Sequence, residues 1–249
     1  MSFPGGRGMI EAITISERML QTMRYEYLLF DADDTLFDFP KASGQAFRRM
    51  CRLHEIPYTP ERYQLYHEIN LELWAAFDRG EVTKEFVTLE RYVRFLKALG
   101  LERDPAECNR DYLAALGEGV YPLPHAEAVC RELKARGHRM YIVTNAVASV
   151  QRSRLQGSVF ADLFNGAFIS EEAGAAKPSR AYFNYVRRQL PEMTDENALV
   201  IGDSLTTDIQ GANNAGLRCC WFNPAGKPRR EGLRVDFEIA DLRDLLKIV

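Results

Sequence analysis

Hydrophobic residues occur along this chain in short runs that alternate with longer amphipathic stretches. The short runs have the length of a β-strand and lack the alternation of apolar and polar residues that marks a half-exposed strand. They cover residues 27–30, 140–143, 167–169, 199–201 and 219–222. Continuous apolar runs are typical of strands covered on both faces, so the pattern predicts a parallel sheet.

Stretches with helical spacing separate most of these runs. In the second half of the chain they cover residues 126–136, 147–156, 180–190 and 207–215. Gly137 and Gly216 follow the first and the last of them, and glycine is the residue that most often ends a helix. Strands that alternate with helices predict an α/β fold with a doubly wound, Rossmann-like parallel sheet.

Residues 39–119 break the alternation, because they contain no convincing strand. Helical spacing covers residues 42–54, 60–78, 84–99 and 105–116 instead. Such a block is too long for a simple crossover between two strands. It predicts an all-helical cap domain over residues 39–119, inserted into an α/β core made of residues 25–38 and 120–249.

The first 24 residues form an N-terminal extension whose role the sequence does not define. Residues 11–23 have helical composition, and three glycines precede them. An ordered helix, a disordered tail and an over-long start all fit this composition. No signal-peptide pattern is present in the segment.

The composition is that of an ordinary globular protein. The 249 residues are 46% hydrophobic and 27% charged, with a net charge of −3. This balance gives no electrostatic reason to expect a nucleic acid or a membrane as partner. No apolar run approaches the length of a membrane span. We expect a monomer or a small homo-oligomer.

The five cysteines form no recognisable metal or disulfide pattern. Their number is odd, and no Cys-x-x-Cys spacing occurs. This usage fits free thiols in a reducing compartment, so we expect a cytoplasmic protein.

The strongest chemical signal is an acidic cluster directly after the first apolar run. Asp31, Asp33 and Asp34 lie within four residues there. Three carboxylates at the end of a buried strand repel one another and lose solvation, unless a cation neutralises them. Mg²⁺ prefers oxygen ligands of this kind. Taken alone, the cluster is equally compatible with an acidic turn in solvent.

Polar residues also follow the next three predicted strands. Thr144 and Asn145 come after the second, and Lys177 comes after the third. Asp203 follows the fourth, with Asp208 five residues beyond it. Parallel strands bring their carboxyl ends to one edge of a sheet, which is where α/β folds bind ligands.

Together these four motifs resemble those of the haloacid dehalogenase superfamily. The resemblance implies that Asp31 is a nucleophile that forms an aspartyl-phosphate. It implies that Asp33 protonates the leaving alcohol and then takes a proton from water. It further implies a Mg²⁺ cofactor bound by the Asp31 and Asp203 carboxylates and the Asp33 backbone carbonyl, with Asp208 completing the site.

The same resemblance implies how the phosphoryl group is bound. Thr144 and the backbone N–H of Asn145 would donate to its oxygens, and Lys177 would neutralise the charge it shares with Asp31. A dehalogenase of this superfamily lacks the second aspartate of the first motif. The presence of Asp33 therefore favours a phosphatase or a phosphomutase.

The cap and several loops resemble bacterial house-cleaning pyrimidine 5′-nucleotidases. The matching stretches are Asp31–Phe37, Asn70–Trp74 with Gly80 and Thr83, Ser170–Pro178, Gly211–Leu217 and Cys220–Asn223. This resemblance implies that the substrate is a small phosphorylated metabolite, a nucleoside 5′-monophosphate. Trp74 and Phe77 share one helix face and could stack on a base, or could pack inside the cap.

Other functions remain open at this point. Within enzymes, the substrate could be phosphoglycolate or a sugar phosphate, or the protein could be a phosphomutase. A phospho-accepting regulatory domain would also combine an acidic cluster, a threonine and a lysine. Such a receiver domain is about half as long and has no helical insertion, which favours the enzyme.

Overall fold

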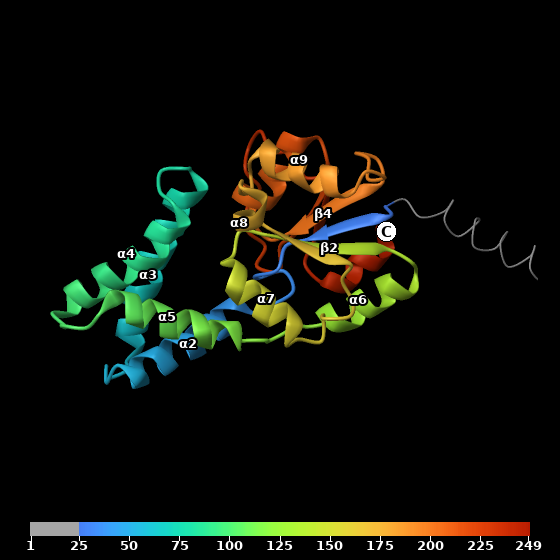
Figure 1. Ribbon diagram of the computed structural model, residues 1–249. Helices are drawn as coiled ribbons and strands as arrows, with labels where there is room; N and C mark the ends of the chain where they lie inside the picture. Colours follow the sequence, from blue (N-terminus) through green and yellow to red (C-terminus); the bar gives the residue numbers. More distant parts are fainter. Residues whose placement is uncertain (1–24) are drawn as a thin grey trace, which may run out of the picture.

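The computed structural model describes residues 25–249, and its core is a six-stranded parallel sheet with the order β3-β2-β1-β4-β5-β6 (Figure 1). The strands are β1 (Tyr27–Phe30), β2 (Arg139–Thr144), β3 (Gly166–Ile169), β4 (Ala198–Gly202), β5 (Arg218–Phe222) and β6 (Phe237–Ile239). The doubly wound parallel sheet predicted from the sequence is thus confirmed. The edge strand β6 was not predicted, because three residues that leave Glu238 exposed give too short a pattern.

Two hydrophobic layers explain why the strands are continuously apolar. In β1, Leu28 and Phe30 face a layer that includes α6 (Ala126–Ala135) and the 3₁₀ helix η2 (Leu242–Lys247). Tyr27 and Leu29 face the opposite layer, which includes α9 (Arg180–Gln189) and α10 (Gln210–Ala215). Figure 1 shows α9 above the sheet and α6 below it. Every position of β1 is buried as a result.

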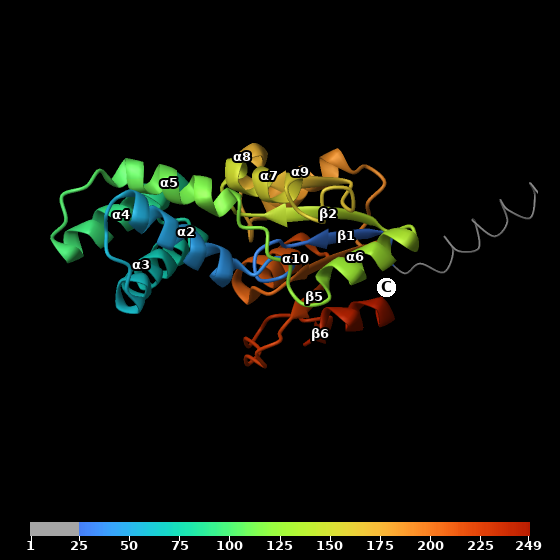
Figure 2. The ribbon, with the colours of Figure 1, turned by 90° about the horizontal axis from the view of Figure 1, so that it is seen from below.

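Four helices lie together beyond one end of the sheet (Figures 1 and 2). They are α2 (Phe39–Leu53), α3 (Pro60–Asp78), α4 (Lys84–Leu99) and α5 (Pro105–Gly117). Thr59, Thr83 and Asp104 cap three of them by accepting a backbone N–H with their side chains. Two of these helices begin with proline, which suits the first helical position.

The helical block has a core of its own, rich in aromatic rings. Phe47 stacks on Tyr66 with ring centroids 4.7 Å apart, and it meets Phe95 edge-on at 5.3 Å. Tyr92 and Tyr112 complete the cluster. This core lets the four helices form as a cap on the sheet, which agrees with the predicted architecture.

Two linkers connect the cap to the sheet and run side by side. The backbone N–H of Asp38 donates to Tyr121 over 2.8 Å, and that of Leu123 donates to Leu36 over 2.8 Å. The domain boundaries at residues 38/39 and 119/120 stay a prediction. The extension 1–24, including the helix expected over 11–23, lies outside the described residues. Between residues 25 and 249, no helix is both long and apolar enough to cross a membrane.

The helix expected over residues 207–215 differs in form. It starts earlier as a π-helical turn, η1 (Leu205–Ile209), and continues as α10. Ser204 causes the early start, because its hydroxyl accepts from the N–H of Thr207 over 3.2 Å. A short helix, α8 (Ser170–Ala173), directly follows β3.

Gly211 provides a test of the packing between α10 and α9. A Cβ atom there would lie 2.7 Å from a ring carbon of Phe183 and 3.2 Å from the Cα atom of Pro178. We expect Gly211→Ala to lower the free energy of unfolding by about 1–3 kcal/mol in urea denaturation. Gly44→Ala in α2 is the control. Its Cβ would make an ordinary 3.7 Å contact with Tyr63, so stability should rise by roughly 0.5–1 kcal/mol. Equal stability of the two variants would contradict this packing.

Candidate active site

The polar motifs meet at the carboxyl edge of the sheet. Asp31 directly follows β1, and its N–H donates to the carbonyl of Ile201 in β4 over 2.8 Å. Thr144 is the last residue of β2, and Asp203 directly follows β4. The parallel pairing of β1 with β2 and with β4 places these three residues on adjacent strands. The structure therefore brings together motifs that are far apart in the sequence.

Lys177 is the centre of this group. Its ammonium donates to Asp31 Oδ1 over 2.6 Å, to Asp208 Oδ1 over 2.6 Å and to the carbonyl of Val143 over 2.8 Å. Burial works to lower the pKa of Lys177, but the charges of Asp208 and Asp31 outweigh it and raise the pKa. All three ammonium protons are used, so Lys177 stays charged and fixed in direction.

Three carboxylates converge around that lysine. Asp31, Asp203 and Asp208 each place one oxygen within 4.8 Å of the others. Burial raises the pKa of Asp31 well above its usual range, and burial together with Asp208 raises the pKa of Asp203 to about 7. Lys177 supplies one positive charge against three carboxylates, which leaves a strong preference for a cation. The all-oxygen donor set fits Mg²⁺.

Two neighbouring residues, Ser204 and Gly202, define the position of the Asp208 carboxylate. The N–H of Ser204 donates to its second oxygen over 3.1 Å. Gly202 is required opposite it, because a Cβ atom on Gly202 would collide with the Asp208 carboxylate. The early π-helical turn thus brings the Asp208 carboxylate against the end of β4.

Asn145 makes a contact that the sequence did not suggest. Its side-chain amide donates to the Lys177 carbonyl over 2.9 Å and accepts from the Lys177 N–H over 2.9 Å. This pair of bonds fixes the backbone from which the Lys177 side chain extends. Thr144, just before it, accepts the N–H of Ala146 on its hydroxyl over 3.1 Å.

A cavity of about 300 Å³ lies between the cap and this edge of the sheet. The core contributes Asp31, Asp33, Thr144 and Lys177 to its walls, and the cap contributes Asn70, Trp74, Asp78 and Arg91. Phe77 is not part of the wall. Its ring packs edge-on against Trp74 at 5.4 Å and lies 5.8 Å from the ammonium of Lys84.

Two cap residues of this wall were missed by the sequence analysis. Asp78 ends α3, and burial raises the pKa of its carboxyl to about 6. Its position four residues after Trp74, on the same helix face, was an available signal. Arg91 is buried and donates to Asn70 over 3.0 Å and to Asn109 over 2.9 Å. No motif in the sequence around Arg91 indicates that this residue lines a site.

Asp33 also reaches the cavity, where it forms an ion pair with Arg154 of α7 (Ala148–Gln156). The Arg154 side chain is fully buried. The sequence analysis missed Arg154 too, because a single arginine in a predicted helix is normally assigned to a solvent-exposed face.

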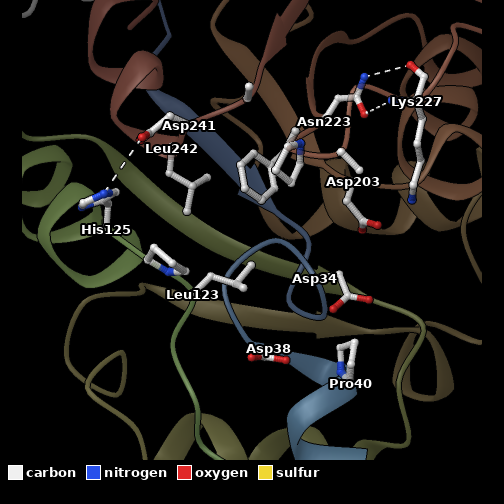
Figure 3. Close-up of a pocket in the computed structure, with 15 residues that line it drawn as sticks. Asp34, Asp38, Pro40, Leu123, His125, Asp203, Asn223, Lys227, Asp241 and Leu242 are labelled. Carbon is white, nitrogen blue, oxygen red and sulfur yellow. Dashed lines mark hydrogen bonds and ion pairs between the residues drawn. The ribbon is translucent and has the colours of Figure 1, made fainter.

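A second cavity, of about 440 Å³, lies on another side of the acidic loop (Figure 3). Asp34 and Asp203 border it, and its far end holds His125, 4.0 Å from Asp241. Asp34 adopts a left-handed backbone with φ 60° and accepts the N–H of Phe39 over 3.3 Å. Thr144 and Lys177 do not line this cavity, so the first cavity is the candidate substrate site.

Residues 28–222 match the family model for haloacid dehalogenase-like hydrolases. This chain belongs to that family. The haloacid dehalogenase-like resemblance predicted from the four motifs is therefore confirmed, and it extends over most of the chain.

Several members of the family resemble this chain over nearly their full length. The HAD-hydrolase YfnB of Bacillus subtilis is 39% identical over 226 residues, which are 91% of this chain and 96% of that protein. The pyrimidine 5′-nucleotidase YjjG of Escherichia coli is 30% identical, covering 91% of this chain and 99% of YjjG. The pyrimidine 5′-nucleotidase PynA of Streptococcus pneumoniae is 30% identical, covering 90% and 94%.

Solved structures agree. The crystal structure of Bacillus subtilis YfnB bound to magnesium superposes with a TM-score of 0.86 at 39% identity, covering 90% of this chain and 98% of that one. A dehalogenase structure at 18% identity gives a TM-score of 0.71, which shows the shared fold alone.

Lys84, the first residue of α4, joins the cap to the core beside the cavity. Its ammonium donates to the Ala146 carbonyl over 2.9 Å and to the Ser170 hydroxyl over 2.8 Å, and lies 3.1 Å from Glu171. Burial lowers the pKa of Lys84, while Glu171 opposes that change. The Lys84 side chain therefore holds the start of α4 against the end of the sheet.

We expect Lys84→Met to weaken the attachment of α4 to the end of the sheet. Hydrogen bonds of charged groups contribute about 1.5–3 kcal/mol each, so amide hydrogen exchange at residues 144–147 and at the start of α4 should accelerate roughly tenfold or more. Lys97→Met, at the exposed opposite end of α4, is the control and should leave exchange unchanged. Identical exchange in the two variants would show that the Lys84 contacts do not hold the cap.

Proposed function

We propose that this hydrolase is a Mg²⁺-dependent phosphatase that acts on nucleoside 5′-monophosphates through an aspartyl-phosphate at Asp31. The observation that carries the proposal is the 2.6 Å contact of Lys177 with Asp31 at the base of a cavity whose roof includes Trp74. A buried ammonium that binds a carboxylate fixes the orientation of this nucleophile and places a positive charge beside it. Relatives that are pyrimidine 5′-nucleotidases support the substrate class.

Each polar residue at the sheet edge has a part in this mechanism. Asp31 attacks phosphorus, and the alcohol oxygen leaves with a proton from Asp33. Asp33 then takes a proton from the water that hydrolyses the aspartyl-phosphate. Thr144 and the N–H of Asn145 donate to the phosphoryl oxygens, while Lys177 offsets their charge.

The carboxylates of Asp31, Asp203 and Asp208, with the Asp33 carbonyl, would hold Mg²⁺. When bound, the ion neutralises the carboxylates and the transferring phosphoryl group. Asn145 contributes through its side chain as well, because its two bonds fix the Lys177 backbone.

The cap favours an enzyme over a phospho-accepting regulatory domain, since it encloses a cavity large enough for a small ester above the nucleophile. We also propose a cytoplasmic location, which the five buried, free cysteines support.

A phosphate-release screen tests the proposal. Nucleoside 5′-monophosphates, sugar phosphates and phosphoglycolate are each supplied with Mg²⁺ and with a chelator. We expect pyrimidine nucleotides to be hydrolysed fastest, activity to need Mg²⁺, and Asp31→Asn to remove turnover while the protein stays folded by circular dichroism. Turnover at the wild-type level by Asp31→Asn would refute the aspartyl-phosphate. Preference for a sugar phosphate or for phosphoglycolate would refute the nucleotidase.

Trp74 tests how the base is held. If a base stacks on Trp74, then Trp74→Ala loses about 1–3 kcal/mol of binding, which raises the KM for nucleotides roughly 5- to 150-fold. The KM for p-nitrophenyl phosphate should change much less. Phe77→Ala, whose ring lies behind Trp74, serves as the comparison and should affect both substrates alike. A parallel loss on both substrates in Trp74→Ala would assign that ring to packing.

A further inference from the structure

Arg154 contacts the acidic loop and both linkers between the sheet and the cap. One terminal nitrogen pairs with the Asp33 carboxylate. Its Nε donates to the carbonyl of Gly119 over 3.1 Å, in the linker that returns from the cap. Its guanidinium carbon lies 4.5 Å from the ring centroid of Phe37, in the linker that leaves for the cap.

The two linkers are themselves tied together at this point. Phe37 forms one backbone bridge with Asp33 and another with Pro122. Gly119 packs so closely that a Cβ atom there would lie 2.8 Å from the Cβ atom of Ala42 in α2. Arg154 therefore contacts both linkers close to the place where the linkers are joined to each other.

Stability alone does not account for this arrangement. Removing a guanidinium from water is costly, and an apolar side chain of similar volume usually packs at least as well. Arg154 is fully buried, and its second terminal nitrogen has no hydrogen-bond partner among residues 25–249. That remaining donor lets the guanidinium bind the other oxygen of Asp33 when the carboxylate turns, without releasing Gly119.

We propose that Arg154 is the positioning residue for Asp33 and links the direction of its carboxylate to the position of the cap. This role rests on the proposed function, because it takes Asp33 as the group that exchanges protons with the leaving alcohol and with water. Arg154 acts through Asp33 and through the linkers, and Gln151, one turn earlier, supports it with a 3.4 Å contact.

The experiment compares two esters that differ in their need for a proton. Nitrophenolate leaves as a stable anion, whereas the nucleoside alkoxide of uridine 5′-monophosphate needs a proton from Asp33. General acid–base catalysis contributes about 10²–10⁴-fold. We expect Arg154→Gln to lower kcat/KM, which covers the steps up to departure of the alcohol, roughly 100-fold for uridine 5′-monophosphate and less than about tenfold for p-nitrophenyl phosphate. Arg152→Gln is the control, since Arg152 lies on the exposed side of α7 and pairs with Glu172.

A double-mutant cycle separates positioning from packing. If Arg154 acts through Asp33, adding Arg154→Gln to Asp33→Asn should cost less than about threefold further on either substrate. Multiplicative losses in the double variant, equal losses on both esters, or full activity of Arg154→Gln would each overturn the proposal.

Arg154→Lys covers the case in which the glutamine variant does not fold. Lysine keeps a positive charge but cannot reach Asp33 and Gly119 together. The same selective loss on uridine 5′-monophosphate is expected, and an unselective loss overturns the proposal. A wild-type enzyme inactive on both esters, or an Asp33→Asn variant with unchanged turnover, would instead refute the proposed function itself.

Discussion

The structure depends on one buried interaction, the ammonium of Lys177 between the carboxylates of Asp31 and Asp208. Burial and the neighbouring carboxylates of Asp208 and Asp203 raise the pKa of Asp31, and the Lys177 ammonium opposes that rise. The arrangement requires a bare backbone at Gly202, where Asp208 fills the space of a side chain. It also requires Asn145, whose amide holds the Lys177 backbone at both its N–H and its carbonyl.

The charged groups and the cap residues that line the cavity come from different parts of the chain. The sheet edge carries the charged groups, and the cap supplies a roof that includes Trp74 and Arg91. The contacts of Lys84 on one side and the Arg154 cluster at the linkers are among those that connect the two parts. In this arrangement the cap residues around the cavity can vary while the charged edge of the sheet stays fixed.

The sequence predicted the sheet well, because strands covered on both faces leave continuous apolar runs. It predicted α3 and α4 at their observed bounds, where a capping threonine precedes each helix. It did not predict β6, which is short and half exposed, or the contacts of Arg154 and Arg91. The contacts of Arg91 with Asn109 and of Arg154 with Asp33 join residues more than 15 positions apart in the sequence. A single arginine in a helical pattern does not indicate which residue it will bind. The side-chain role of Asn145 was hidden for the same reason.

The paired linkers have a consequence for how such a protein can change over time. The chain leaves the sheet at Asp38 and comes back at Tyr121, and a 2.8 Å hydrogen bond joins those two residues. The cap that lies between these two residues therefore begins and ends at neighbouring positions. A different helical block with equally close ends can be exchanged there by recombination, without moving any strand. New specificity can therefore be acquired as a module, while the inherited catalytic edge remains untouched.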